Sequence, residues 1–449
     1  MIHPQVISRS RVGRYGAAAL VAAVVLAVLV VSALLDYKTV RAVPGRAAII
    51  GLTATALAAV ATVLFVRAFE HDAARRMRRI LQASVLFGLA ALAWLLILDT
   101  YLFTQEAGPD AAIVCALACL PTTAFGLWVV RRLDRYEPEP WALILLAAAW
   151  GGIVATCLVV WFEGMWESVS AALLVPGPGL EASNAFSAGL FEETAKGTAV
   201  LLLFLTVRSR FDDVVDGIVY GAAVGLGFNF LESIAYMTNV YAIFGPGSDG
   251  PTAAAFQWYA RQVLGLFFGH ATYTALIGAG IGVARQLAPR RQAVIAILCG
   301  WLVAMAAHFA WDAWLTFFPI SRTGLAILEV HLRTLVMTGP FTAAVAVLLV
   351  LGLARESINL RRQMELEAAS GSGAIWPAEV PLLISPWQRL RARLGILGRF
   401  GFGAYRNVTR LQRAQLNLAM ARWHAERHEL ESPLDDLRTR VMRLKAPPA

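Results

Sequence analysis

Hydrophobic residues lie along the chain in blocks of about twenty, and the short segments between the blocks carry most of the charges. An α-helix of that length spans the hydrocarbon core of a bilayer, which is ~30 Å thick. We therefore expect ten transmembrane helices, at roughly 16–35, 47–66, 80–103, 111–130, 141–162, 186–206, 217–241, 262–284, 293–318 and 334–354. The pattern predicts an all-α fold: a polytopic membrane helix bundle with a helical cytoplasmic tail.

Composition supports a membrane protein and excludes two other classes. Of the 449 residues, 58% are hydrophobic and 15% are charged. A soluble domain has roughly 45–50% apolar and about 25% charged residues, so a soluble enzyme and a disordered chain are both excluded. The four cysteines all lie inside apolar blocks, and no disulfide framework is expected.

The distribution of basic residues between the loops predicts the orientation of the chain. Basic residues are concentrated in the N-terminus, in the loops 67–79, 131–140 and 285–292, and around Arg208. The alternate loops hold few, with Arg261 at a helix end. The positive-inside rule then places both termini in the cytoplasm. Because Arg greatly outnumbers Lys and Ala is abundant, as in GC-rich bacterial genomes, we expect a multi-pass protein of the bacterial cytoplasmic membrane.

Residues 355–449 form a tail with sixteen basic and nine acidic residues. Ser385 and Pro386 have the form of a helix N-cap followed by Pro at the first helical position. The following turns place four apolar residues on one face, with four arginines around it: Trp387, Leu390, Leu394 and Leu397, and Arg389, Arg391, Arg393 and Arg399. Two interpretations stay open, a cytoplasmic helical appendage or a helix on the anionic inner leaflet. No nucleic-acid-binding motif occurs, so a nucleic-acid partner is not expected.

These observations divide the chain into three predicted parts. Residues 1–130 hold four transmembrane helices, residues 131–354 hold six, and residues 355–449 form the basic tail with amphipathic helices. Ionisable residues inside the apolar blocks occur almost only in the second part. Because a charge inside a bilayer is costly and needs a partner or a function, we expect the chemistry of the protein there.

Seven ionisable residues lie inside four consecutive blocks: Glu192, Glu193 and Lys196, then Glu232, then His270, then His308 and Asp312. At 1.5 Å of rise per residue from the outer ends of the blocks, the glutamates and histidines lie roughly 10–15 Å deep. Helices that run in alternating directions would thus bring them into one layer of the outer leaflet. This predicts a shared polar cavity that opens to the outside.

The residues alone leave several roles open. Lys196 follows Glu192 by four residues and Glu193 by three, so a helix pairs its ammonium with a carboxylate, which would be structural. One Lys cannot neutralise two carboxylates, and the remaining one needs a proton, a metal or another cation. His308 and Asp312 are spaced i, i+4, and an Asp so placed can orient a ligating His. Single histidines can equally be interhelical hydrogen-bond partners.

Glutamates and two histidines are also a suitable set of zinc ligands with a general base, although no HExxH helix is present. An intramembrane hydrolase and an ion- or proton-coupled transporter are equally compatible with these residues. A transporter would be expected to show internal repeats or broken helices, and the sequence has no such repeat. A third possibility is a non-enzymatic bundle that binds a membrane partner.

Four ordered motifs resemble the PrsW family of bacterial intramembrane metalloproteases. They are FEETAKG at 191–197, DDVVDGIVYGAAVGLGFNFLESIAY at 212–236, GHATYTALIGAGIG at 269–282 and HFAWDAW at 308–314. The segment DRYEPEPWALILLAAAWGGIVA at 134–155 is similar to the lead-in of that family. The resemblance covers roughly residues 130–320, and the N-terminal blocks and the tail lie outside it.

The resemblance implies an intramembrane endopeptidase that cuts single-span membrane proteins, typically anti-sigma factors, near the outer membrane surface. The motifs are also similar to those of the wider superfamily of CAAX-prenyl endopeptidases and bacteriocin-processing proteins. Glu192 and Glu193 match its double glutamate, His270 its lone histidine, and His308 with Asp312 its last motif.

Two features are specific to this chain or to the PrsW pattern. Glu232 belongs to the PrsW pattern, in Phe228-x-x-x-Glu232. Lys196 is a departure, because the wider superfamily usually has an Arg one position later.

The resemblance therefore assigns expected roles. We expect the catalytic residues to be Glu192, Glu193, Lys196, His270, His308 and Asp312, and the ligands of a divalent metal, expected to be zinc, to be Glu232, His270 and His308. A glutamate in a low-dielectric cavity can act as the general base toward water. The histidines either bind the metal or donate to the oxyanion. The expected partners are a single-span membrane substrate and the lipid bilayer, and the sequence does not specify an oligomeric state.

Overall fold

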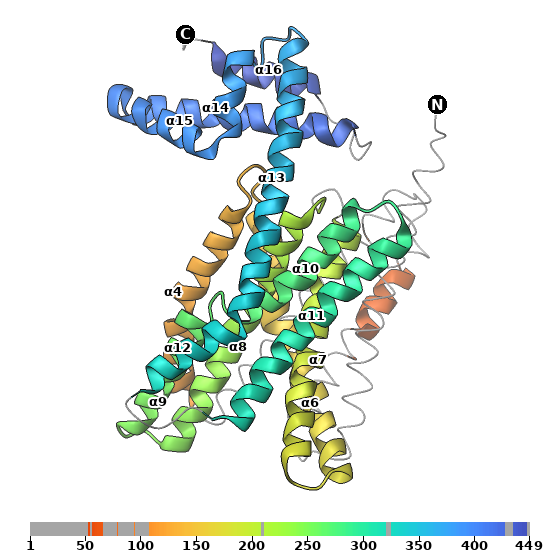
Figure 1. Ribbon diagram of the computed structural model, residues 1–449, viewed down its shortest axis with the longest axis vertical. Coiled ribbons are helices and arrows are strands. Elements are labelled where there is room, and N and C mark those ends of the chain that lie inside the picture. The colour runs from red at the N-terminus through yellow and green to blue at the C-terminus, as the bar shows by residue number, and fades with distance from the viewer. Residues whose placement is uncertain are drawn as a thin grey trace. The chain divides into compact units, whose positions relative to one another are not determined.

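The computed structural model describes residues 53, 56–65, 79, 94, 107–207, 211–319, 325–426 and 434–446, which form helices and turns without a strand (Figure 1). Contacts divide the chain into two compact units. The membrane unit comprises Met1–Val130 and Pro140–Val345, and the tail unit comprises Arg131–Glu139 and Ala346–Ala449.

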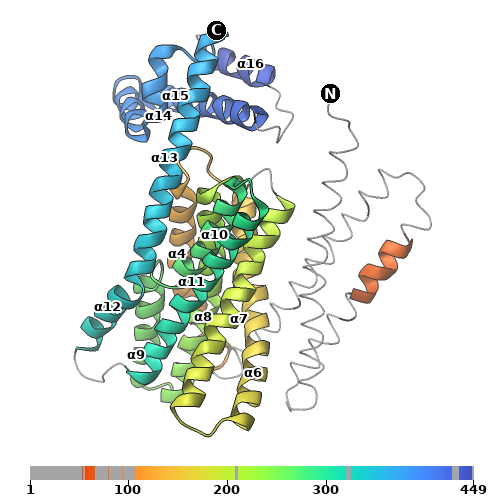
Figure 2. The same ribbon diagram turned by 45° about the vertical axis from the view of Figure 1, so that its right-hand side comes forward.

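The helices of the membrane unit follow one another with short connections. In chain order they are α4 (Pro109–Leu133), α5 (Trp141–Ala149), the π-helical segment η1 (Trp150–Ala155), α6 (Thr156–Leu173), α7 (Pro178–Thr206), α8 (Val214–Phe244), α9 (Asp249–Trp258), the π-helical segment η3 (Tyr259–Leu264), α10 (His270–Gln286), α11 (Arg290–Phe317), α12 (Ala326–Met337) and the beginning of α13 (Gly339–Ala369). Helices α7, α8, α10 and α11 lie side by side (Figures 1 and 2).

Helix α8 is the buried centre of the membrane unit and packs closely against α10. Its glycines Gly217, Gly221 and Gly225 recur every four residues and therefore share one helix face. A Cβ atom at any of them would overlap backbone atoms of α10, and at Gly225 these belong to His270. The close approach of the two backbones thus fixes His270, the first residue of α10, against α8.

Five helices within the described ranges are long and apolar enough to cross a membrane: α4, the continuous helix Trp141–Leu173, α8, α11 and α13. They confirm the predicted all-helical, multi-pass membrane fold. The predicted number of about ten spans stays a prediction. The blocks 16–35 and 80–103 lie outside the described residues, apart from Trp94, and the block 47–66 is represented by the short apolar helix Ala56–Phe65.

Several predicted helix boundaries were wrong. The block 262–284 was predicted as one helix, but α10 begins only at His270, after a turn that contains Gly265 and Gly269. The block 334–354 is likewise divided at Thr338, where α12 ends and α13 begins with Gly339 and Pro340. Hydrophobicity does not mark either break, because the residues on both sides are equally apolar. The sequence did mark both helix starts. Gly269 precedes α10, and Pro340 is the second residue of α13.

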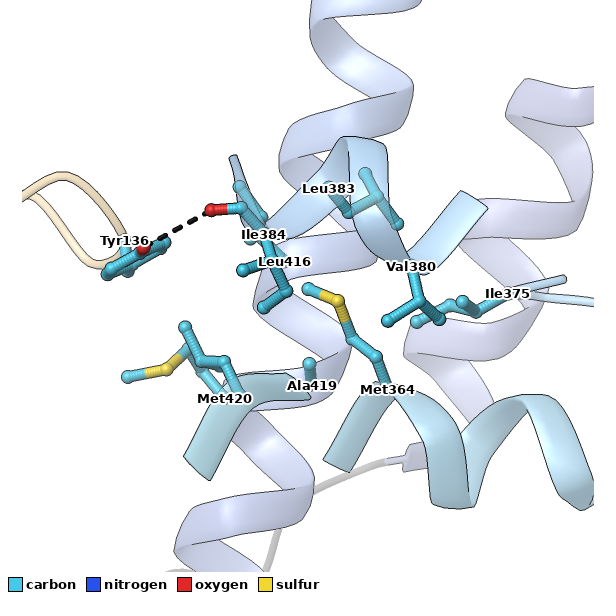
Figure 3. Close-up of a cluster of buried hydrophobic side chains, with 10 residues drawn as sticks. Tyr136, Met364, Ile375, Val380, Leu383, Ile384, Leu416, Ala419 and Met420 are labelled. Atoms are coloured by element: carbon cyan, nitrogen blue, oxygen red, sulfur yellow. Dashed lines mark hydrogen bonds between the residues drawn. The ribbon is translucent and has the colours of Figure 1, made fainter. Parts of the chain in front are cut away.

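The tail unit is helical, as predicted, and has a hydrophobic core of its own. It consists of the end of α13, the short 3₁₀ turn η4 (Pro377–Glu379), α14 (Val380–Ile384), α15 (Pro386–Glu426) and α16 (Leu434–Lys445). Tyr136, from the segment Arg131–Glu139, packs against Met364, Leu416 and Met420, and its hydroxyl donates a hydrogen bond to the Ile384 carbonyl at 3.2 Å (Figure 3). Burial raises the pKa of this tyrosine.

Candidate functional site

The seven ionisable residues singled out from the sequence converge in the membrane unit. Helix α7 supplies Glu192, Glu193 and Lys196, α8 supplies Glu232, α10 supplies His270, and α11 supplies His308 and Asp312. Each is within 4 Å of at least one other member of the set. The structure thus brings together the residues that the sequence predicted to share one layer, while their catalytic roles stay a prediction.

Lys196 lies at the centre of this cluster. Because α7 places it one turn after the two glutamates, its Nζ atom is 3.1 Å from Oε2 of Glu192 and 2.6 Å from Oε1 of Glu193. The same ammonium is 3.0 Å from Nδ1 of His270 and 4.2 Å from the centre of the Phe228 ring. Lys196 therefore pairs with both glutamates and does not neutralise one of them alone.

The contacts of His270 indicate which of its two ring nitrogens carries the proton. An ammonium has only donors, so Nδ1 of His270 accepts from Lys196 and the ring proton resides on Nε2. Nε2 lies 2.5 Å from Oε2 of Glu232, and that same oxygen is 2.9 Å from the guanidinium of Arg261 on η3. Arg261, Glu232, His270 and Lys196 thus form one chain of polar contacts.

His308 is held on both sides of its ring. Nδ1 lies 2.9 Å from Oε1 of Glu193, and Nε2 lies 3.3 Å from Oδ2 of Asp312 and 3.6 Å from Oε2 of Glu192. The ring stacks on Tyr273, with the ring centres 5.1 Å apart. The i, i+4 spacing of His308 and Asp312 therefore puts both on one side of α11, as predicted.

The two adjacent glutamates have different surroundings. A cavity of about 490 Å³ is lined by Glu163, Glu192, Glu232, His270, His308 and Asp312, among others. Glu193 is not among its lining residues and is 0% exposed. Its two carboxylate oxygens are occupied by Lys196, His308 and the Thr274 hydroxyl, which donates at 3.2 Å. Of the pair, Glu192 is the carboxylate that a molecule in the cavity can reach.

Sequence reasoning missed four contributors to the cluster. Arg261 was interpreted as a basic residue at a helix end, and Glu163 lay one residue beyond the end of the predicted block 141–162. Tyr273 and Thr274 carry no charge and lie within the GHATYTALIGAGIG motif, so only the fold shows that they contact His308 and Glu193. Glu163 reaches the cavity because α6 continues to Leu173, beyond the end of the predicted block.

The donor types fit a divalent metal. Glu192, Glu193, His270 and His308 each offer one ligand atom, all buried and all within 4.8 Å of one another. Two imidazole nitrogens and two carboxylate oxygens are ligands that zinc accepts. The charges fit as well, because within the described residues the carboxylates Glu192, Glu193, Glu232 and Asp312 share two permanent cations, Lys196 and Arg261.

The predicted ligands His270 and His308 belong to this group of four, and the ligand role of Glu232 stays a prediction. In the structure Glu232 contacts Nε2 of His270 and Arg261 and lies outside the four-residue group. A carboxylate on the far nitrogen of a histidine is the usual second partner of a metal-binding histidine. In this structure the Lys196 ammonium lies within 3.1 Å of three of the four donors, so a metal there competes with Lys196 for them.

The fold and the cluster define a class of protein: a multi-pass helical membrane protein with a glutamate–histidine centre between its helices. Comparison with known proteins narrows this class. Residues 139–356 match the family described as PrsW family intramembrane metalloprotease. The resemblance predicted from the sequence is thereby confirmed for this segment of the chain.

Two relatives carry the same family name. The chain is 30% identical over 159 residues to Protease PrsW of Geobacillus kaustophilus (strain HTA426), which covers 35% of this chain and 61% of the relative. It is 32% identical over 104 residues to Protease PrsW of Bacillus subtilis (strain 168), which covers 23% of this chain and 44% of the relative. The matches thus span less than two thirds of either relative. No solved structure matches the chain.

Proposed function

We propose that the protein is an intramembrane endopeptidase that hydrolyses a peptide bond in single-span membrane proteins near the extracytoplasmic side of the membrane. The observation that carries this proposal is the convergence of Glu192, His270 and His308 on one cavity of the membrane unit. The names of the matched family and of both relatives support the reaction type. An anti-sigma factor is the substrate that the resemblance suggests.

Glu192 is proposed as the general base. It lines the cavity, so a water molecule there can be hydrogen-bonded to it, and a positioned carboxylate can take the proton as the water attacks the carbonyl carbon. Its Oε2 atom contacts Lys196 at 3.1 Å, which fixes the carboxylate in place. Glu193 is proposed as a positioning residue, because its carboxylate oxygens contact Lys196, His308 and Thr274 and so hold these side chains in place.

His308 is proposed to stabilise the oxyanion. His308 presents Nε2 between Glu192 and Asp312 on the cavity wall, and in its imidazolium form, with Nδ1–H donated to Glu193, it can donate Nε2–H to the developing negative charge. Asp312 orients that ring and is the most exposed member of the cluster, with its side chain 27% exposed. Proton transfer from the Glu192 carboxyl to the leaving amine then completes hydrolysis.

A metal adds a second way to activate the same water. The residues proposed to hold a divalent ion, zinc by the donor types, are Glu192, His270 and His308, with Glu232 behind His270. Such an ion, when bound, supplies Lewis acidity toward the water and the scissile carbonyl. In its absence, the ammonium of Lys196 supplies positive charge at the same place.

The transporter alternative uses the same buried carboxylates, and the comparisons do not support it. The matched family and both relatives are named as proteases. A transporter would move an ion or solute without cutting a protein, so one experiment separates the two functions.

The test is reconstitution of the purified protein in vesicles with a panel of single-span membrane proteins, followed by detection of fragments. Cleavage by the wild-type protein and its loss in Glu192→Gln is the expected result. Glu181→Gln is a matched control, because Glu181 is an exposed carboxylate in the first turn of the same helix. Cleavage at the wild-type rate by Glu192→Gln would contradict the proposed base.

A further inference from the structure

The first half of α15 presents an apolar and basic surface that no other part of the described chain covers. The helix begins at Pro386, as predicted, and the Ser385 hydroxyl accepts a hydrogen bond from the Gln388 amide at 3.3 Å. Trp387 is 70% exposed and Leu394 is 53% exposed, and Leu390 and Leu397 lie exposed at the same helical spacing. Four large apolar side chains thus form one exposed stripe.

A neighbouring side of this helix is fixed to the tail unit by two arginines. Arg389 is buried and donates to the carbonyl of Leu383 and, at 3.2 Å, to that of Arg135. Arg393 donates from Nε to Oε1 of Gln412 at 2.6 Å. These contacts set the rotation of the helix, so the exposure of the apolar stripe follows from the packing of the unit.

The apolar surface continues beyond the end of the stripe. Gly401 has a φ of 76°, a left-handed conformation that divides α15 into two helical parts. Phe400 and Phe402 flank this kink and are 71% and 64% exposed. Aromatic side chains beside a chain bend can insert at the boundary between headgroups and acyl chains.

The charge along this segment of the chain has one sign. Between residues 380 and 425 the chain has eight arginines and no acidic residue. Arg391, Arg399 and Arg406 are exposed, and the Arg406 guanidinium lies 6.0 Å from the Phe402 ring centre. A basic helix with an exposed apolar face complements a surface that is both negatively charged and apolar below its charges.

We propose that this surface, defined as Trp387, Leu390, Leu394, Leu397, Phe400 and Phe402 with Arg391 and Arg399, lies on an anionic phospholipid bilayer. The tail is continuous in the chain with α13, a helix able to span the membrane, so a weak affinity for lipid acts at a high local concentration. The positive-inside prediction places the tail on the cytoplasmic side, where the anionic lipids are enriched. The proposal is independent of the proposed protease activity.

The test uses the full-length protein in vesicles and a fluorescent label that reports contact with lipid. Cys299 is exposed while Cys115, Cys119 and Cys157 are buried, so a Cys299→Ser background leaves an added cysteine as the site of labelling. An environment-sensitive dye is attached at Leu394→Cys, or at Asp436→Cys on an exposed position of α16 as the control. Quenching by nitroxide-labelled lipid is compared in vesicles of phosphatidylcholine with and without phosphatidylglycerol.

The expected result is several-fold stronger quenching at position 394 than at position 436 in vesicles that contain phosphatidylglycerol, and a large reduction of this difference without it. The double variant Arg391→Glu/Arg399→Glu should reduce quenching at position 394. The charge-matched control Arg440→Glu/Arg443→Glu, at exposed positions of α16, should not reduce it.

Three outcomes would overturn the proposal. The first is equal quenching at positions 394 and 436. The second is quenching at 394 that is indifferent to phosphatidylglycerol and to both arginine substitutions, which would remove the role of anionic lipid. The third is protection of the 394 label from a water-soluble quencher without quenching by lipid, which would indicate a protein, such as a second copy of the chain, on this surface.

Discussion

Glu232 Oε2 lies 2.5 Å from Nε2 of His270, and the same oxygen lies 2.9 Å from Nη1 of Arg261. The carboxylate holds the ring in the orientation that directs Nδ1 toward Lys196 and Glu192. Arg261 contacts Glu232 and also lines the cavity, and we expect its main effect on the chemistry to pass through Glu232 and His270.

We therefore predict that Arg261→Gln lowers cleavage by roughly 10–100-fold, the range found for residues that orient a ligand or a catalytic histidine. The loss should fall on kcat with little change in KM, since Arg261 acts on the orientation of His270. Arg261→Lys, which keeps the charge, should recover part of the rate. A KM effect of the same size in both variants would instead indicate that Arg261 binds the substrate directly.

The two adjacent glutamates are predicted to respond differently to the same substitution. Glu192→Gln should lower cleavage by roughly 10²–10⁴-fold, the usual contribution of a general base, with little change in thermal stability. Glu193→Gln should lower both, because the buried Lys196 and His308 lose their shared negative partner. Cleavage rates and thermal melting in detergent, measured on both variants and on Glu181→Gln, check this. Retention of full activity by Glu192→Gln, with loss in Glu193→Gln alone, would exchange the two roles.

The sequence predicted which residues converge better than how they are arranged. Spacing and motif resemblance predicted that Glu192, His270 and His308 would share a cavity, and they do. The sequence did not distinguish the accessible Glu192 from the buried Glu193. Neighbouring residues point in different directions from a helix, and only tertiary packing decides which direction faces the cavity. The same limit applies to Arg261, whose contact with Glu232 joins the separate elements η3 and α8.

The tail shows the same division between local and long-range information. The start of α15 at Pro386 and its apolar stripe follow from local patterns and were predicted. The hydrogen bond of Tyr136 with Ile384 joins residues 248 positions apart in the chain, and no periodicity indicates such a pair. Membership of the segment Arg131–Glu139 in the tail unit could therefore be learned only from the structure.

Metal analysis should distinguish the two ways in which the water can be activated. We predict about one divalent metal ion per chain in the purified protein, and loss of cleavage on chelation with recovery on addition of zinc. Since the Lys196 ammonium contacts three of the four donors, Lys196→Met should bind the metal more tightly than the wild-type protein. Metal content by mass spectrometry gives this result independently of activity. Metal-free protein with full activity would favour the mechanism that uses glutamate, histidine and Lys196 alone.

The last prediction concerns the position of the cut in the substrate. The rise-per-residue estimate places the glutamates and histidines in the outer half of the bilayer, roughly 10–15 Å below its outer surface. A substrate helix must unwind locally to expose a carbonyl to Glu192, and unwinding is least costly near a helix end, where backbone hydrogen bonds are already incomplete. The cut should therefore fall in the extracytoplasmic juxtamembrane region or the outer third of the substrate span. Mass spectrometry of both product fragments locates the bond, and products cut in the cytoplasmic half would contradict either the predicted orientation of the chain or the assignment of this cavity.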